Sequence, residues 1–339
     1  MNIPVKKSHF LLFPTCIPIK GYSQSIIMDL DRGAYIEIPN LLYDILKSVI
    51  SKQSIQDIKS LFDHKHDDGI DQYFEYFVNN SYGFYTYNPV PFNPTETTFH
   101  SPYKIISSVI TFDKSSRYDI ADVLNQLDRL SCQLIQFRCY DYCSLDNLGK
   151  TLDSIKESSI RKVEIFIPHN IKYKELDLVK FVQKYPRTIL IVFGAQEDKK
   201  VKVEKKSVKN LIYTSKKLSK DTKEAITLNS FTITHQMYYE SLAYNTGLYR
   251  KVSIDTNGDI KNYISHDKVY GNVMKDSIET IIETDDFKQK YFISNNNIEK
   301  CKDCQFRHMC TSSSDITIKE QKFFKSDLCN FDPYSNTWN

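Results

Sequence analysis

The feature that most constrains this chain is a group of four cysteines near the C-terminal end of the sequence. Three of them stand in the run Cys301-Lys-Asp-Cys304-Gln-Phe-Arg-His308-Met-Cys310, and the fourth is Cys329. Cysteines at such spacing are typical ligands of a zinc ion or an iron–sulfur cluster, and four thiolates complete the ligand set of either. The sequence therefore predicts that this part of the chain folds around a metal or a cluster.

Composition restricts the class of protein. The 339 residues are 41% hydrophobic and include only 9 glycines and 11 prolines, which is typical of a globular protein with more than one core. The net charge of +3 is too small to indicate nucleic-acid binding. No apolar run has the length of a signal peptide or a membrane span, so we expect a cytoplasmic protein without a membrane partner.

The other cysteines have simpler interpretations. In the reducing cytoplasm, clustered cysteines are more often ligands than disulfides. His308 inside the run has the chemistry to substitute as a ligand, but we expect it to be solvated or to lie beside the ligands instead. The scattered cysteines are most simply buried thiols: Cys16, Cys132, Cys139 and Cys143.

Residues 1–95 predict a winged-helix-like α+β domain. We expect strands at 10–17, 25–30, 34–38 and 83–86 and helices at 41–49, 54–62 and 71–79. Asn40 can cap the first helix, and Ser54 with Asp57 has the spacing of a capping box for the second. The proline-rich segment 88–94 reads as the linker that follows.

From residue 103 the strand and helix patterns alternate, which predicts βαβ units around a parallel sheet. The expected elements are, in order, 105–112, 120–130, 134–138, 145–158, 163–167, 176–185 and 188–193. The units stop near residue 235, so we predict an α/β fold with a partial (β/α) barrel over 103–240. A lysine-dense stretch at 199–223 is most simply a solvated surface, and the alternative is a binding site for an acidic peptide or phosphate.

The last segment, 241–339, has a recognisable order. A hairpin around Asn257-Gly258 is followed by Tyr270-Gly-Asn-Val, a helix near 277–289, and the cysteine run. This order resembles the SPASM domain, the C-terminal extension of many radical-SAM peptide maturases. In detail it is similar to the peptide maturase of grasp-with-SPASM systems, encoded beside an ATP-grasp ligase and a short precursor peptide.

The resemblance implies a cofactor. Full SPASM domains carry two auxiliary [4Fe–4S] clusters. The residues that match the ligands of the second cluster are Cys301, Cys304, Cys310 and Cys329. Gly247 and Tyr263 stand where the first cluster's motif places cysteines, so we expect one [4Fe–4S] cluster at most. The spacing alone leaves zinc as an alternative.

The radical-SAM signature Cys-x3-Cys-x2-Cys is missing. No cysteine follows the strand at 105–112, and Cys139-Tyr-Asp-Tyr-Cys143 has Asp146 at the third position. We therefore expect no S-adenosylmethionine and interpret Cys139 and Cys143 as structural. No phosphate loop, dinucleotide fingerprint or hydrolase motif is present, so the sequence names no catalytic residue and leaves open whether the protein is an enzyme.

These features lead to one leading hypothesis and two alternatives. The N-terminal layout resembles elements that recognise peptide leaders by adding the leader to a sheet edge; the alternative is an ordinary packing domain. The leading hypothesis is an accessory maturase that binds a ribosomally made precursor peptide there and assists a partner ATP-grasp ligase. The alternatives are a redox enzyme that acts on the peptide through the cluster, and a structural interaction protein with a zinc knuckle.

Overall fold

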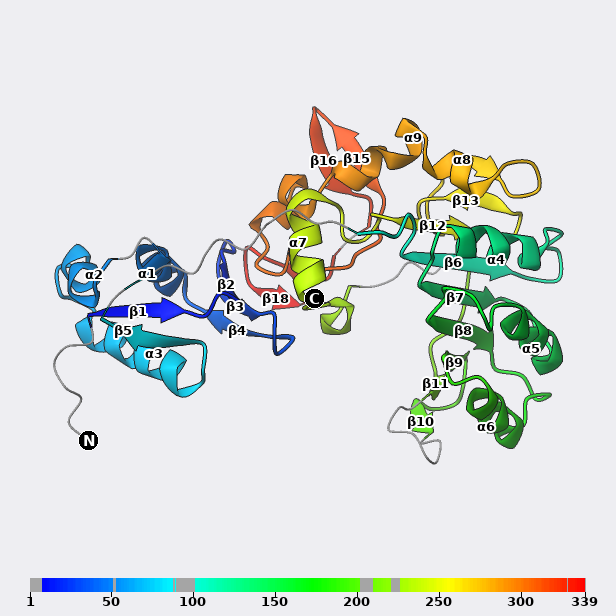
Figure 1. Ribbon diagram of the computed structural model, residues 1–339, viewed down its shortest axis with the longest axis horizontal. Coiled ribbons are helices and arrows are strands. Elements are labelled where there is room, and N and C mark those ends of the chain that lie inside the picture. The colour runs from blue at the N-terminus through cyan, green and yellow to red at the C-terminus, as the bar shows by residue number, and fades with distance from the viewer. Residues whose placement is uncertain are drawn as a thin grey trace.

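The computed structural model describes residues 8–50, 53–87, 89, 101–201, 210–220, 226–327 and 329–338. An N-terminal α+β unit and a large sheet lie at opposite ends of the molecule, with a C-terminal lobe between them (Figure 1). Within the described residues, no helix combines the length and the apolar character needed to span a bilayer.

The N-terminal unit contains two small antiparallel sheets and three helices. Strands β1 (His9–Leu12) and β5 (Gly83–Thr86) pair with each other. The other sheet has the order β2-β3-β4, with β2 at Cys16–Ile19, β3 at Ser25–Asp29 and β4 at Ala34–Ile38. The helices are α1 (Asn40–Ile50), α2 (Ile55–Leu61) and α3 (Asp67–Asn79).

Local chemistry explains these boundaries. The capping box is confirmed, because Ser54 Oγ accepts from Asp57 N at 3.0 Å and Asp57 Oδ2 accepts from Ser54 N at 3.1 Å. Asn40 was expected as a cap but lies inside α1, and its side-chain amide donates to Tyr22 O at 2.7 Å. The single strand predicted at 10–17 is wrong, since a turn at 14–15 divides it into β1 and β2. Most of the predicted linker, 88 and 90–94, lies outside the described residues.

Strand β3 is buried on both faces. All five of its residues are buried. Ile27 packs into the core of the N-terminal unit with helices α1 to α3, whereas Ile26 and Met28 pack against Phe306 and other residues of the C-terminal lobe. The small sheet therefore joins the two parts of the molecule through a shared apolar layer.

The large sheet is mainly parallel. Its order is β10-β11-β9-β8-β7-β6-β12-β13-β14. The parallel strands are β6 (Ser107–Phe112), β7 (Leu134–Cys139), β8 (Lys162–Pro168), β9 (Thr188–Phe193), β11 (Leu211–Thr214) and β12 (Lys251–Ile254). The antiparallel strands are β10 (Lys199–Val201), β13 (Asp259–Lys261) and β14 (Gly271–Asn272).

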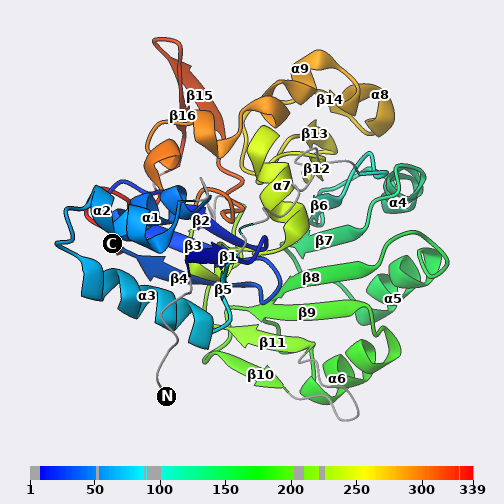
Figure 2. The ribbon, with the colours of Figure 1, turned by 60° about the vertical axis from the view of Figure 1, so that its left-hand side comes forward.

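Three helices connect the parallel strands: α4 (Ile120–Arg129), α5 (Leu145–Ser154) and α6 (Glu175–Lys184). All three cover the same face of the sheet (Figure 1, Figure 2). The predicted α/β class with a large parallel sheet is confirmed. The alternation did not predict β12, which belongs to the hairpin at 251–261 and pairs with β6 on the side opposite β7. Two strands, β10 and β11, also form inside the lysine-dense stretch.

The C-terminal lobe is built from short elements. It includes η1 (Leu228–Ser230), α7 (His235–Ala243), α8 (Ile278–Ile282), α9 (Asp285–Lys288), η2 (Gln289–Phe292), η3 (Asn295–Asn297), η4 (Cys301–Asp303), β15 (Ile316–Lys319), β16 (Lys322–Lys325), β17 (Phe331–Asp332) and β18 (Thr337–Trp338). The single helix predicted near 277–289 is wrong. The chain breaks at Thr284, whose side chain caps α9 by accepting from Phe287 N at 3.3 Å.

Candidate functional site

The four C-terminal cysteines share one neighbourhood. Cys301 begins η4 and Cys304 directly follows it, Cys310 pairs with Phe231 in an isolated bridge, and Cys329 lies two residues before β17. All four are partly buried free thiols. Burial raises the pKa values of Cys301 and Cys304, and the charges of Cys310 and Cys329 add to the rise. The predicted ligand residues therefore lie in one part of the lobe.

Burial favours the protonated form of three of these thiols, Cys301, Cys304 and Cys329. It raises the pKa of Cys301 to about 11, and it also raises the pKa values of Cys304 and Cys329. Since the thiolate is the ligand, a bound cation must displace the protons. Any metal or cluster that binds here therefore has to compensate for the free-energy cost of forming thiolates at buried positions.

The lobe supplies donors that stabilise thiolates. Phe306 N donates to Cys304 Sγ at 3.4 Å, and Phe331 N donates to Cys329 in the same manner, so both hydrogen bonds connect a cysteine to the residue two positions later. Lys325 lowers the pKa values of Cys301 and Cys329 by its positive charge. Backbone N–H donors and nearby cations are the usual surroundings of metal-bound sulfur.

The donor set fits a group held by four sulfurs. In the described ranges, no three or more His, Cys, Asp or Glu side chains are arranged to hold a single metal ion. The four cysteines nevertheless have the chemistry of a [4Fe–4S] ligand set, with N–H donors and lysines beside the sulfurs. They would hold such a cluster, whereas their arrangement in the described residues does not match a single zinc ion.

His308 is tied to a helix. Its ring is buried, and Nδ1 lies 2.7 Å from Ser241 Oγ on α7. Burial, assisted by the charge of Arg307, lowers the pKa of His308 to about 3. The ring is therefore neutral and positions the cysteine loop against α7, as expected for a histidine beside the ligands.

The cysteine loop also contacts the N-terminal sheet. Tyr22 N donates to Asp303 O at 2.8 Å, and the Arg307 guanidinium donates to Lys20 O. The Tyr35 and Phe306 rings are in edge contact, with centroids 5.4 Å apart. The residues between the cysteines thus hold the turn between β2 and β3.

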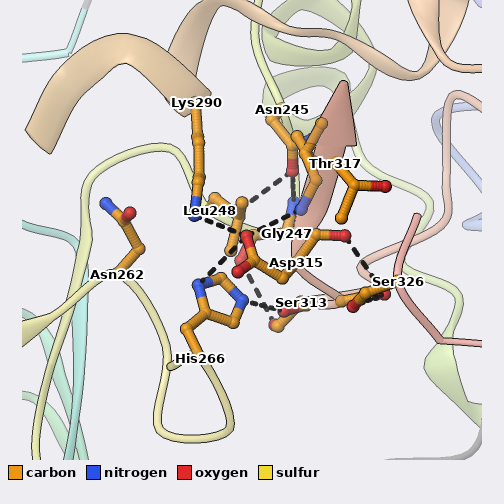
Figure 3. Close-up of polar contacts among 12 residues, drawn as sticks. Asn245, Gly247, Leu248, Asn262, His266, Lys290, Ser313, Asp315, Thr317 and Ser326 are labelled. Carbon is orange, nitrogen blue, oxygen red and sulfur yellow. Dashed lines mark hydrogen bonds and ion pairs between the residues drawn. The ribbon is translucent and has the colours of Figure 1, made fainter. Parts of the chain in front are cut away.

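A polar network occupies the region where the resemblance places the first SPASM cluster (Figure 3). His266 Nε2 donates to Ser313 O at 2.9 Å, and Ser313 Oγ donates to Gly247 O at 3.2 Å. Asp315 accepts from Lys290 and lies 3.7 Å from His266 Nδ1. Burial lowers the pKa of His266. Sequence reasoning missed this network, because its members are isolated polar residues far apart in the chain.

Tyr263, at the other missing cysteine position, faces the large sheet. Its hydroxyl accepts from the Arg138 guanidinium at 3.0 Å, and Arg138 lies on β7 with only 5% of its surface exposed. Arg138 Nε also donates to Gln136 Oε1 at 2.7 Å. The tyrosine therefore belongs to a buried polar contact between the lobe and the sheet.

A polar cavity of about 350 Å³ lies at the carboxyl ends of β6 and β12. One lysine–aspartate pair lines it, Lys261 with Asp255 at 3.0 Å, and Lys220, which also lines it, is paired with Asp113 outside the cavity. The hydrogen bond from Lys220 holds the pKa of Asp113 far below its usual range. In open parallel sheets, ligands usually bind at the carboxyl ends of the strands, at the point where the chain connections of two neighbouring strands lead to opposite sides of the sheet. The cavity has the dimensions and polarity for a small charged group.

The remaining cysteines are largely as expected. Cys16, Cys132 and Cys139 are buried, whereas Cys143 is partly exposed, so the prediction of a buried thiol is wrong for Cys143. Its exposure follows from its place in a loop ahead of α5.

Glu240 on α7 gives the protein a pH-dependent stability. Burial raises its pKa to about 7 from the ordinary 4.5, against the opposing charges of Lys251 and Arg250. Between these values the folded protein keeps a proton that the unfolded chain has lost, so stability falls as pH rises through this window. We expect Glu240→Gln to increase the free energy of unfolding by roughly 1–3 kcal/mol at about pH 8 and to flatten the profile.

Urea unfolding of wild type and Glu240→Gln between about pH 4 and pH 8 measures this difference. Glu157→Gln, at an exposed position, is the control and should follow the wild-type profile. Parallel wild-type and Glu240→Gln profiles would contradict a buried, titrating Glu240.

Comparisons with known proteins do not assign the chain to a family. No family model matches it, and no curated protein matches it. Two crystal structures of Streptococcus suis SuiB are similar to it. The one bound to S-adenosylmethionine is 13% identical with a TM-score of 0.28, covering 89% of this chain and 94% of SuiB. The other is 11% identical with a TM-score of 0.33, covering 88% and 94%.

TM-scores this low do not establish a shared fold. What the chain's own structure establishes is a mixed α/β architecture, a large and mainly parallel sheet, and a lobe that packs Cys304 and Cys329 in a core shared with the N-terminal sheet.

Proposed function

We propose that the chain is a cytoplasmic accessory protein in the modification of ribosomally made peptides. It binds the precursor peptide on its N-terminal unit and presents it to a partner ATP-grasp ligase. One [4Fe–4S] cluster is held by Cys301, Cys304, Cys310 and Cys329. No S-adenosylmethionine is included, because the Cys139 and Cys143 thiols leave the three-cysteine signature incomplete.

The observation that carries this proposal is the edge strand β4. In the part of the chain that the structure describes, β4 pairs with β3 alone, so its outer side is an open sheet edge. Ala34 and Glu37 on β4 are exposed. An extended peptide binds such an edge by main-chain hydrogen bonds, while its side chains supply the specificity. The neighbouring strand β3 packs against a hydrophobic core on each of its faces, so the edge belongs to a firmly packed sheet.

The cluster has a supporting role in this function. When bound, a cluster with four cysteine ligands stabilises the lobe or passes electrons, and it has no open position for substrate. The loop that the cysteines would fix holds the β2–β3 turn through Asp303 and Arg307. The ligand site therefore supports the sheet on which the peptide binds.

A second candidate is an enzyme that performs its own step on the peptide. The cavity of about 350 Å³ at the ends of β6 and β12 favours it, because it has room for one side chain of a bound peptide. A mass change in the precursor with this protein and a reductant, without the ligase, would distinguish this candidate from an accessory role.

We expect short peptides encoded beside the gene to bind the full-length protein and to protect the amides of residues 34–38 from hydrogen exchange. Ala34→Lys should weaken binding by about tenfold or more, since a lysine on an edge strand opposes the addition of another strand. Thr317→Lys places the same side chain on an exposed position of β15 and should bind normally. Protection elsewhere, with 34–38 unchanged, would refute the edge-strand proposal.

A further inference from the structure

Two cysteines outside the C-terminal lobe lie in contact with each other. Cys139 is the last residue of β7, and Cys143 directly precedes Ser144, the N-cap of α5. The Cys143 side chain packs against the core that contains Cys139, the two side chains are close enough to interact, and both are free thiols. The short connection from strand to helix therefore brings two thiols together at the carboxyl edge of the sheet.

A tyrosine fixes the loop that carries Cys143. Tyr173 Oη donates to Cys143 O at 2.6 Å and accepts from Cys143 N at 3.1 Å. The Tyr142 ring lies 5.1 Å from the Tyr173 ring, and Lys172 Nζ lies 4.7 Å from the Tyr142 centroid. Both the N–H and the C=O of Cys143 are therefore hydrogen-bonded to Tyr173, which holds the loop in place beside Cys139.

The two thiols differ in access and acidity. Cys139 is 1% exposed, whereas Cys143 is partly exposed. The interaction with the Cys139 side chain lowers the pKa of Cys143, and burial raises the pKa of Cys139. An accessible, more acidic thiol beside a protected one is the arrangement in which the first attacks a disulfide and the second completes the exchange.

We propose that Cys139 and Cys143 form a redox-active dithiol that exchanges with disulfides of small thiol compounds. The Cys143 thiolate attacks one sulfur of the external disulfide, forms a mixed disulfide and expels one thiolate, which takes up a proton. Cys139 loses its proton and attacks the Cys143 sulfur, which expels the second thiolate. The dithiol is oxidised to an internal disulfide, and the external disulfide is reduced to two thiols.

Cys132 provides a natural comparison. It is buried with 0% exposure, and its Sγ donates to Leu134 O at 3.3 Å. Burial raises the pKa of this thiol to about 12. Cys132 therefore represents a structural cysteine of the same sheet, without an acidic, accessible thiol. The dithiol site depends neither on the four C-terminal cysteines nor on peptide binding.

Tryptic cleavage after Arg138 and Lys150 makes the test specific, because the peptide 139–150 contains both thiols and no other cysteine. The full-length folded protein is treated with oxidised glutathione, alkylated, digested and analysed by mass spectrometry. We expect this peptide to lose the mass of two hydrogen atoms, and dithiothreitol to restore it. The peptide that contains Cys132 should react at least about tenfold more slowly.

Variants separate the two roles. Cys139→Ser should trap glutathione on Cys143, Cys143→Ser should show neither product, and Cys132→Ser should behave as wild type. Cys139→Ala provides a second form if the serine disturbs the core. A wild-type peptide 139–150 that stays reduced, or that carries a stable glutathione adduct without closing, would overturn the proposal.

Discussion

Gly247→Ala is expected to destabilise the C-terminal lobe by about 3 kcal/mol or more and to lower the unfolding temperature by several degrees. A Cβ at this position would lie 1.8 Å from Ser312 O and 2.5 Å from Ser312 C. These are backbone atoms, so no side-chain rotation relieves the overlap. The segment 311–314 would have to move, and with it the hydrogen bond from Ser313 to Gly247. Thermal or urea unfolding of the purified variant measures the loss.

Gly69→Ala is the matched control and should act in the opposite direction. Gly69 lies in α3, and a Cβ there would meet no atom within 4 Å. Alanine in a helix is favoured over glycine by about 0.5–1 kcal/mol, so this variant should be slightly more stable than wild type. If Gly247→Ala unfolded like wild type, the close approach of 247 to 312 would be wrong. The same overlap applies to Gly247→Cys, because any Cβ at this position meets Ser312 O.

The double change Cys304→Ala and Cys310→Ala is expected to abolish cofactor binding. Protein purified without oxygen should contain about four irons and four sulfides per chain, and the variant close to none, because two thiols cannot retain the cluster. Iron, sulfide and zinc analysis with an absorption spectrum measures the content. One zinc and no iron in the wild type would instead identify a structural knuckle.

The same variant should loosen the N-terminal sheet. Phe306 packs against β3, and Arg307 and Asp303 bond to the chain between β2 and β3, so the cysteine loop links cofactor content to that sheet. Hydrogen exchange at 19–23 should increase in the variant. Cys16→Ala removes a buried thiol of the N-terminal core and should leave the metal content unchanged. Unchanged hydrogen exchange at 19–23 in the variant would show that the cofactor does not stabilise the N-terminal sheet.

Local pattern predicted most of the elements of the large sheet. The apolar runs predicted as strands at 105–112, 134–138 and 188–193 became β6, β7 and β9, and the amphipathic stretches between them became helices, because both signals depend on neighbouring residues. The position of β12 beside β6 could not be predicted. Its partner is more than a hundred residues away, and the hairpin signal at Asn257-Gly258 specifies only the turn.

The candidate site also has one part that the sequence predicts and one part that it does not. The proposed ligand set rests on spacing, since Cys301, Cys304 and Cys310 are close in sequence. Its support by the N-terminal sheet does not, because Ile26 and Phe306 carry no mutual signal in one sequence. The contact between Cys139 and Cys143 was also missed. Their spacing was read only against a three-cysteine motif, while the strand end and helix start that bring them together depend on the tertiary fold.

The layered position of β3 has a consequence for biosynthesis. Ile26 and Met28 are made roughly 280–300 residues before Phe306 and Phe331, which cover them. At about 5–20 residues per second, one face of the sheet stays bare for roughly 15–60 s. A growing chain that exposes an apolar sheet for so long is prone to aggregate, so its yield in cells should depend on a holding chaperone until these covering residues have been made.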